Sequence, residues 1–302
     1  MRALARFAMR GPLFAAGSAA GLVLASLVLG ILFIPAAAIV ALTTLRFGPR
    51  EGLKVAAIAT ALVLVARLGL GQSAVSTVLL AVIAWLPAWF MAAVLRVRRA
   101  QHSPLLVAAG LVLIYAVTLR AMVGDVTAFW REWLQPLFDV MAKDAGAKFT
   151  AEQITFIAKQ AHVWSLVGVL VTFAAVILLA RWWQAVFYNP GGFGSEFREL
   201  RMPRVLASVA GLLALAYAFG RDGLLVAAVA GDACVILVVL FALQGLAVIH
   251  FLARERAMAG GWLTMLYVML MLVPQVAGPI LATTGLADNI VDLRRPRRSQ
   301  RP

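Results

Sequence analysis

The sequence predicts an all-α fold, a polytopic transmembrane helical bundle with eight to ten membrane segments. Apolar residues make up 63% of the 302 residues. They fall into blocks of about 20, which is the helical length that crosses the hydrocarbon of a bilayer. Arginines stand at the ends of these blocks, as is typical of the loops of membrane proteins. We therefore expect a lipid bilayer to surround most of the chain.

The apolar blocks follow one another with short polar connections. They cover residues 12–45, 55–70, 73–95, 104–123, 163–188, 205–219, 223–252 and 261–287. The first block is too long for one straight span, and Pro35 with the Gly30 region predicts its division into helices at about 12–29 and 32–45. In the last block, Pro274 and the Gly278-Pro279 pair predict a hairpin of two short helices. Ten segments result, with eight or nine as alternatives if a block is not divided.

The distribution of basic residues predicts the orientation. Most of the 27 Lys and Arg residues fall on the side that contains Arg2, Arg6 and Arg10, and the side richer in cations is cytoplasmic. Seven fall on the other half: Arg67, Arg120, Arg131, Lys143, Lys148, Lys159 and Arg221. We expect a retained first helix, both termini in the cytoplasm, and a bacterial inner membrane.

Residues 124–162 form the longest polar stretch and are expected outside. Apolar side chains recur there at helical spacing, and Thr150 with Gln153 forms a capping box. The pattern predicts two amphipathic helices lying on the outer membrane surface. A lid over a substrate pocket is the alternative.

Composition argues against several function classes. A net charge of +14 would suit nucleic-acid binding in a soluble protein, but the cations here lie between apolar blocks, so no nucleic acid is expected. Cys234 is the only cysteine, and His102, His162 and His250 are scattered at segment ends, where interfacial or packing roles are expected. We expect no metal and no cofactor. Nothing resembles a catalytic constellation, so the chain is not predicted to be an enzyme.

Three motifs in the second half carry a family resemblance. They are Arg181-Trp182-Trp183-Gln184; the turn Asn189-Pro190-Gly191-Gly192-Phe193, followed by Glu196-Phe197 and Leu200-Arg201; and Gly285-Leu286-Ala287-Asp288-Asn289 with Asp292 and Arg294. With these motifs the chain resembles the YybS-like family of bacterial inner-membrane proteins, whose activity is not established. From the residues alone, Asp288 and Asp292 share a helix face beside arginines, and a charge cluster at a helix end explains them.

The first half, residues 1–188, is also similar to the substrate-binding S component of energy-coupling factor vitamin transporters. The residues concerned are Pro35, the turn Gly48-Pro49-Arg50-Glu51-Gly52, and the pairs Ala16/Ala20 and Gly17/Gly21. The resemblance implies six helices that receive a solute from outside and a first helix that docks on a membrane partner. Plain internal packing is the alternative for the small-residue pairs. Residues 189–302 add transmembrane helices and a basic cytoplasmic tail.

Asp232 is the main candidate for a ligand-binding residue. Burying an ionisable group within a membrane span costs free energy, and groups that are kept there usually belong to functional sites. The topology places Arg67, Gln72, Arg120 and Arg221 at the same depth in the outer half of the membrane. These five residues predict a site for a small anionic or zwitterionic solute. The alternative is a structural ion pair of Asp232 with one arginine, the others extending to the interface. We therefore expect solute binding or transport, or alternatively a non-transporting scaffold that docks a membrane protein partner.

Overall fold

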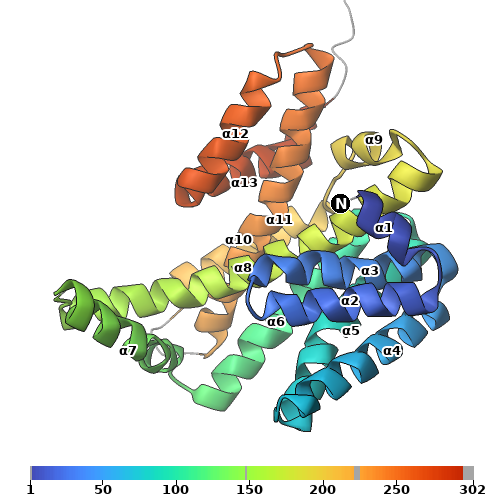
Figure 1. The fold of residues 1–302 in the computed structure, drawn as a ribbon. Helices are drawn as coiled ribbons and strands as arrows, with labels where there is room; N and C mark the ends of the chain where they lie inside the picture. Colours follow the sequence, from blue (N-terminus) through green and yellow to red (C-terminus); the bar gives the residue numbers. More distant parts are fainter. Residues whose placement is uncertain (1, 147, 221–224, 295–302) are drawn as a thin grey trace, which may run out of the picture.

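The computed structural model describes residues 2–146, 148–220 and 225–294, and this part of the chain is built of helices without a strand (Figure 1). The first six α-helices and one 3-10 helix are α1 (Arg2–Ala8), α2 (Pro12–Ser26), η1 (Gly30–Leu32), α3 (Phe33–Phe47), α4 (Pro49–Gly69), α5 (Ala74–Arg98) and α6 (His102–Val123). The remaining helices are α7 (Val126–Ala145), α8 (Ala151–Tyr188), α9 (Gly192–Arg198), α10 (Val205–Ala218), α11 (Leu225–Glu255), α12 (Gly261–Leu272) and α13 (Pro274–Val291). The predicted all-α class is confirmed.

Six helices of the described part are long and apolar enough to cross a membrane, with η1 and α3 counted together, and α2, α10 and α12 are shorter apolar helices. The division of the first block is confirmed, because η1 separates α2 from α3. The hairpin break at Pro274 is also confirmed, since α12 ends at Leu272 and Pro274 begins α13. The Gly278-Pro279 pair was also expected to interrupt the helix, but it does not, because Pro279 lies inside α13.

Helix α3 lies at the centre of the first half. Every side chain from Pro35 to Leu45 is buried, and the helix packs against α2, α4, α5 and α8. A helix that is apolar on all sides belongs in a core, and the alanines at 36–38 and 41 let its neighbours approach closely. Helix α3 is therefore the core around which α2, α4, α5 and α8 are arranged.

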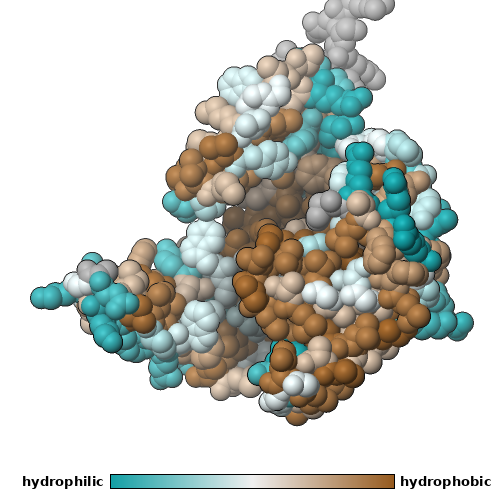
Figure 2. Space-filling view, in the orientation of Figure 1, coloured by the Kyte–Doolittle hydropathy of each residue, from teal (hydrophilic) through white to brown (hydrophobic). Residues whose placement is uncertain are grey.

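The surface of the bundle is apolar over α2, α4 and α5. Large apolar side chains such as Leu62, Val65 and Ile83 are exposed, and Figure 2 shows a broad hydrophobic face over α2 and α4, with hydrophilic residues gathered over α7 and beside α1. An exposed apolar surface of this extent marks contact with a membrane or a partner. A bilayer fits the six long helices.

Helix α8 differs from the prediction of two separate amphipathic helices in residues 124–162. Helix α7 is one of them, but the second is the beginning of α8, which runs without interruption for 38 residues. At 1.5 Å per residue it is roughly 57 Å long, well beyond about 30 Å of hydrocarbon. Its first part therefore projects from the bundle together with α7 (Figure 1). The capping box of Thr150 and Gln153 is confirmed.

Helices α11 and α13 make the most extensive pairing in the molecule. Two glycines allow it: a Cβ on Gly245 would lie 1.9 Å from the Leu281 carbonyl oxygen, and one on Gly285 would lie 2.0 Å from that of Phe241. Such distances are sterically impossible for any side chain without movement of the backbone. The two helices therefore cross with their backbones in contact, as small residues permit in membranes.

Candidate functional site

Arg120, His162 and Asp232 meet where α6, α8 and α11 pack together. Arg120 donates two hydrogen bonds to Asp232, from Nε to Oδ2 at 2.6 Å and from Nη2 to Oδ1 at 2.8 Å. His162 Nε2 lies 3.0 Å from Asp232 Oδ1 and 3.4 Å from Arg120 Nη2. The predicted cationic neighbour of Asp232 is thus present, and Arg120 provides it in the paired geometry that gives charged hydrogen bonds their strength.

The cluster is enclosed by the bundle. Asp232 is 5% exposed and His162 is 7% exposed, while the Arg120 side chain is 17% exposed. A buried carboxylate without a partner would cost several kcal/mol, so Arg120 and His162 are the groups that stabilise the Asp232 carboxylate among apolar helices. Because the Arg120 side chain is partly exposed, the cluster can be reached from the surface of the bundle on the Arg120 side.

One polar atom of the cluster makes no hydrogen bond with the described residues. His162 Nδ1 is buried and has no hydrogen-bond partner among the described residues. Because the Asp232 carboxylate accepts hydrogen bonds, the 3.0 Å contact makes His162 Nε2 the donor and assigns the ring proton to it, and Arg120 Nη2, which is also a donor, is then a close neighbour of Nε2 and not its hydrogen-bond partner. His162 Nδ1 is then an unused acceptor, and this atom is where the cluster can bind a donor group of a further molecule.

The other predicted ligand residues lie elsewhere. Arg67 Nη2 is 3.5 Å from Gln72 Oε1 and 3.4 Å from Ser76 Oγ, so it belongs to the turn between α4 and α5 and is not a partner of Asp232. Arg221 lies outside the described residues. The expected group of five is therefore divided: Arg120 pairs with Asp232, whereas Arg67 and Gln72 lie together at the turn between α4 and α5. The ligand-binding role of the group stays a prediction.

His162 is the functional candidate that the sequence analysis missed. It was placed at a segment end because the span was predicted to begin at residue 163, whereas α8 begins at Ala151. Continuing the helix from the Thr150 capping box through residue 163 would have placed His162 more than two turns inside it.

A second buried polar network joins α11 and α13 to the loop before α10. Arg294 donates to both oxygens of Asp288, at 3.1 and 2.6 Å, and to the backbone carbonyls of Arg198 and Leu200. Gln244 accepts a hydrogen bond from the Met202 N–H and donates to Asp288, both at 2.8 Å. The network holds the loop at residues 199–204 against the two crossed helices.

Motif residues of the second half meet in this network. Asn289 donates to the Met202 carbonyl, and Arg201 pairs with Asp292, whose hydrogen bond raises the pKa of the Arg201 guanidinium. Asp288 is 1% exposed, so it is a core residue. The predicted charge cluster at the end of α13 is present, but one of its two carboxylates is buried rather than solvated.

The small residues of α2 divide between two faces. Ala16 and Ala20 are 0% and 4% exposed and pack inside the bundle. Gly17 and Gly21 are exposed, and a Cβ at either would meet nothing within 4 Å. Internal packing therefore explains the alanine pair, whereas no described residue of this chain packs where side chains at Gly17 and Gly21 would begin.

The two glycine-rich turns have local steric causes. Gly48 has φ 107° and ends α3, and a Cβ on Gly52 would lie 1.9 Å from Thr44 Oγ1. In the second turn, Asn189-Pro190-Gly191-Gly192, Gly191 has φ 86°, and a Cβ on Gly192 would lie 2.1 Å from Asn189 Nδ2. Both turns require glycine for backbone shape.

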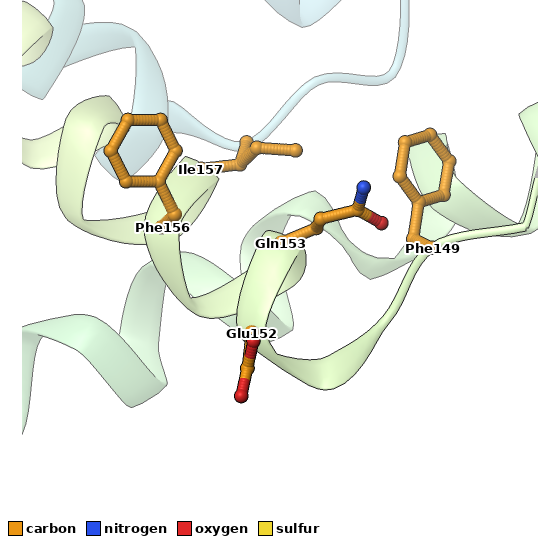
Figure 3. Close-up of a pocket in the computed structure, with 5 residues that line it drawn as sticks. All are labelled: Phe149, Glu152, Gln153, Phe156 and Ile157. Carbon is orange, nitrogen blue, oxygen red and sulfur yellow. The ribbon is translucent and has the colours of Figure 1, made fainter.

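Two cavities lie outside the cluster. One, of about 390 Å³, is lined by Phe149, Glu152, Gln153, Phe156 and Ile157 at the start of α8. Figure 3 shows Gln153 extending toward Phe149 while Glu152 points away, so this cavity belongs to the projecting hairpin of α7 and the first part of α8.

The second cavity, of about 520 Å³, is lined by Leu45, Leu95, Arg96, Arg99, Gln101, Arg181, Gln184 and Glu196. Within the described residues no group of three His, Cys, Asp or Glu side chains is placed to hold a metal ion.

Comparison of the chain with models of known protein families, with characterised proteins and with solved structures gave no match.

Proposed function

We propose that this protein is a multi-pass membrane protein that binds a small anionic or zwitterionic solute at the Arg120–His162–Asp232 cluster and carries it across the bilayer. The observation behind this proposal is the meeting of two basic side chains on one buried carboxylate between apolar helices. Ionisable residues inside membrane bundles mark solute and proton pathways. The S-component resemblance of residues 1–188 supports entry from the outside.

The arrangement accounts for how such a solute would bind. An anionic group competes with Asp232 for Arg120, because a guanidinium binds any carboxylate or phosphate in the same paired geometry. A donor group on the solute fits the unpartnered His162 Nδ1. The 17% exposure of Arg120 gives the solute a side from which to approach.

The test is retention of a co-purifying small molecule by the Asp232→Asn variant. Full-length wild type and variant are purified in mild detergent, and the bound small molecules are measured by native mass spectrometry. Asp232→Asn keeps the shape of the side chain and removes its charge, so solute retention by the folded variant should change. A zwitterion whose cationic group needs Asp232 should be lost, whereas a simple anion, which no longer competes with Asp232 for Arg120, should be retained more strongly. Asp288→Asn is the matched control, since it removes a buried carboxylate from the other network; any Asp288→Asn protein that stays folded should retain solute. Unchanged solute retention in Asp232→Asn would contradict the proposal.

The second candidate function is a membrane scaffold that docks a partner helix. The outward-facing Gly17 and Gly21 favour it, because small residues permit close approach of a second helix in the bilayer. Gly17→Leu is expected to keep wild-type thermal stability and to lose a co-purifying membrane protein. Ala16→Leu, one residue away but fully buried, is expected to lower stability instead. If Gly17→Leu changes neither property, the glycine face contacts lipid only.

A further inference from the structure

The cavity between the ends of α3, α5, α6, α8 and α9 is lined by three arginines, one glutamate and two glutamines. It is remote from the Arg120 cluster. Arg181 follows His162 by nearly 20 residues on the same continuous helix, which corresponds to roughly 28 Å. This distance is close to the thickness of the hydrocarbon, about 30 Å. The cavity therefore lies at the opposite side of the membrane region from His162, the side to which the arginine distribution assigns the cytoplasm.

The only acidic side chain that lines this cavity is already neutralised. Glu196 accepts hydrogen bonds from Arg181 Nε at 2.9 Å and from Arg181 Nη2, and Gln101 Nε2 donates to it at 2.9 Å. Arg181 Nη1 also donates to Gln184 Oε1 at 3.1 Å. Arg181 and Glu196 thus form an ion pair without net charge, which links α8 to α9 on one side of the cavity.

The other two arginines keep their positive charge unbalanced. Arg96 Nη1 donates to the backbone carbonyl oxygens of Leu45 and Arg46, at 2.6 and 3.3 Å, which fixes the side chain without a carboxylate. For Arg99, none of the described residues provides a carboxylate within ion-pair distance or a hydrogen-bond acceptor for its guanidinium. Arg99 also has φ 55° at the end of α5, where glycine is the usual residue. The cavity therefore has an excess of two positive charges.

Gln101 adds an oriented acceptor. Its Nε2 must face the Glu196 carboxylate to donate, so the orientation of the amide is fixed. Its Oε1 is buried and unpartnered among the described residues. A group that fills the cavity would be anionic toward Arg96 and Arg99 and would offer an O–H or N–H to Gln101.

We propose that this cavity binds a phosphate group that carries a hydroxyl or amine, either on a lipid headgroup or on a soluble phosphate compound. Arginine matches phosphate oxygens in number and geometry, and basic pockets between transmembrane helices bind anionic headgroups. A volume of about 520 Å³ is within the range of small-molecule sites. The proposal uses none of the residues of the Arg120 cluster and stands independently of the solute proposed there.

The experiment compares Arg99→Gln with Arg98→Gln in the full-length protein. Both remove one exposed arginine at the end of α5, but only Arg99 lines the cavity. Thermal unfolding in neutral detergent is measured against inorganic phosphate, with chloride holding the ionic strength constant. Retention of phosphatidylglycerol over phosphatidylcholine is measured by native mass spectrometry from mixed vesicles. Of these two lipids, phosphatidylglycerol has a net negative charge and free hydroxyls in its headgroup, and phosphatidylcholine has neither.

Binding of either probe should weaken about tenfold in Arg99→Gln, as expected for loss of a charged hydrogen bond, and should be unchanged in Arg98→Gln. Arg99→Lys, which keeps the charge, should lose less. Selective retention of phosphatidylglycerol would identify a lipid headgroup as the source, and binding of inorganic phosphate without lipid selectivity would identify a soluble compound. Equal responses of the two glutamine variants, or binding of neither probe by the wild type, would overturn the proposal.

Discussion

Among the described residues, two buried arginine–aspartate pairs have the same local geometry and different surroundings. Arg294 and Asp288 form a pair that extends to the backbone carbonyls of Arg198 and Leu200 and, through Gln244, to the Met202 N–H. Within the described part of the chain, Arg120 and Asp232 make polar contacts with one further side chain, that of His162. The first pair fastens a loop to two helices, whereas the second joins three helices through side chains alone.

This difference indicates how a structural ion pair is distinguished from a candidate site. Burial does not distinguish them, because both aspartates are nearly inaccessible. In the Asp288 network most polar atoms are used within the protein, with Asn289 Oδ1 as an exception, and the network ends on backbone. The Asp232 cluster ends on the unpartnered His162 Nδ1 and on the partly exposed Arg120. The mutations below test the comparison, from the largest expected effect to the smallest.

The largest effect is expected for Asp288→Asn. It leaves the Arg294 guanidinium buried without a counter-ion, and breaking a buried pair in this way costs about 3–5 kcal/mol of unfolding free energy. Reversible unfolding in mixed detergent micelles measures this cost. A loss below about 1 kcal/mol would show that the loop does not depend on the pair.

A smaller loss is expected for Gly285→Ala. The added methyl group would lie 2.0 Å from the Phe241 carbonyl oxygen, so α11 and α13 must separate, and an overpacked contact costs about 1–3 kcal/mol. Gly278→Ala, on the same helix with nothing within 4 Å of its Cβ, is the matched control and should be neutral or slightly stabilising. Equal stability of the two variants would mean that the helices do not cross as described.

The smallest stability effect is expected for His162→Phe. Asp232 keeps both hydrogen bonds from Arg120 and loses one neighbour, so the cost should be about 1 kcal/mol, the net value of a single hydrogen bond. The same unfolding measurement applies. A loss as large as that of Asp288→Asn would show that His162 is part of a structural lock, and the distinction between the two clusters would disappear.

Local signals in the sequence predicted much of the fold. Pro35 and Pro274 mark where the long apolar blocks divide, because each lies in the first turn of a helix, where proline is best tolerated. The capping box at Thr150 marks the start of the helix that continues as α8. Depth alone indicated that Asp232 has an arginine partner, with Arg67 and Arg120 as the two candidates, since a charge within the membrane requires a partner. It did not indicate which of the two pairs with Asp232. The membrane orientation rests on the same kind of reasoning and stays a prediction.

The packing partners could not be predicted in this way. Helix α11 is apolar on all sides, so no polar stripe shows which of its faces meets α13 and which meets α6 and α8. The contact of Gly245 with Gly285 and the burial of Gln244 depend on side-chain contacts between residues about 40 positions apart. The capping box at Thr150 was enough to place His162 inside a helix, but its contacts with Arg120 and Asp232 depend on where α6 and α11 pack against α8.

The most direct test of the central claim, that the Arg120 cluster binds solute rather than only stabilising the fold, is the double variant Arg120→Gln with Asp232→Asn. It removes both charges together, so neither is left buried alone, and similar exchanges of buried pairs for neutral residues are often tolerated. Thermal stability and solute retention are measured on the same full-length preparation. The account predicts near wild-type stability with loss of the solute. Near wild-type stability with undiminished solute retention or transport would contradict it and leave the cluster as a structural ion pair.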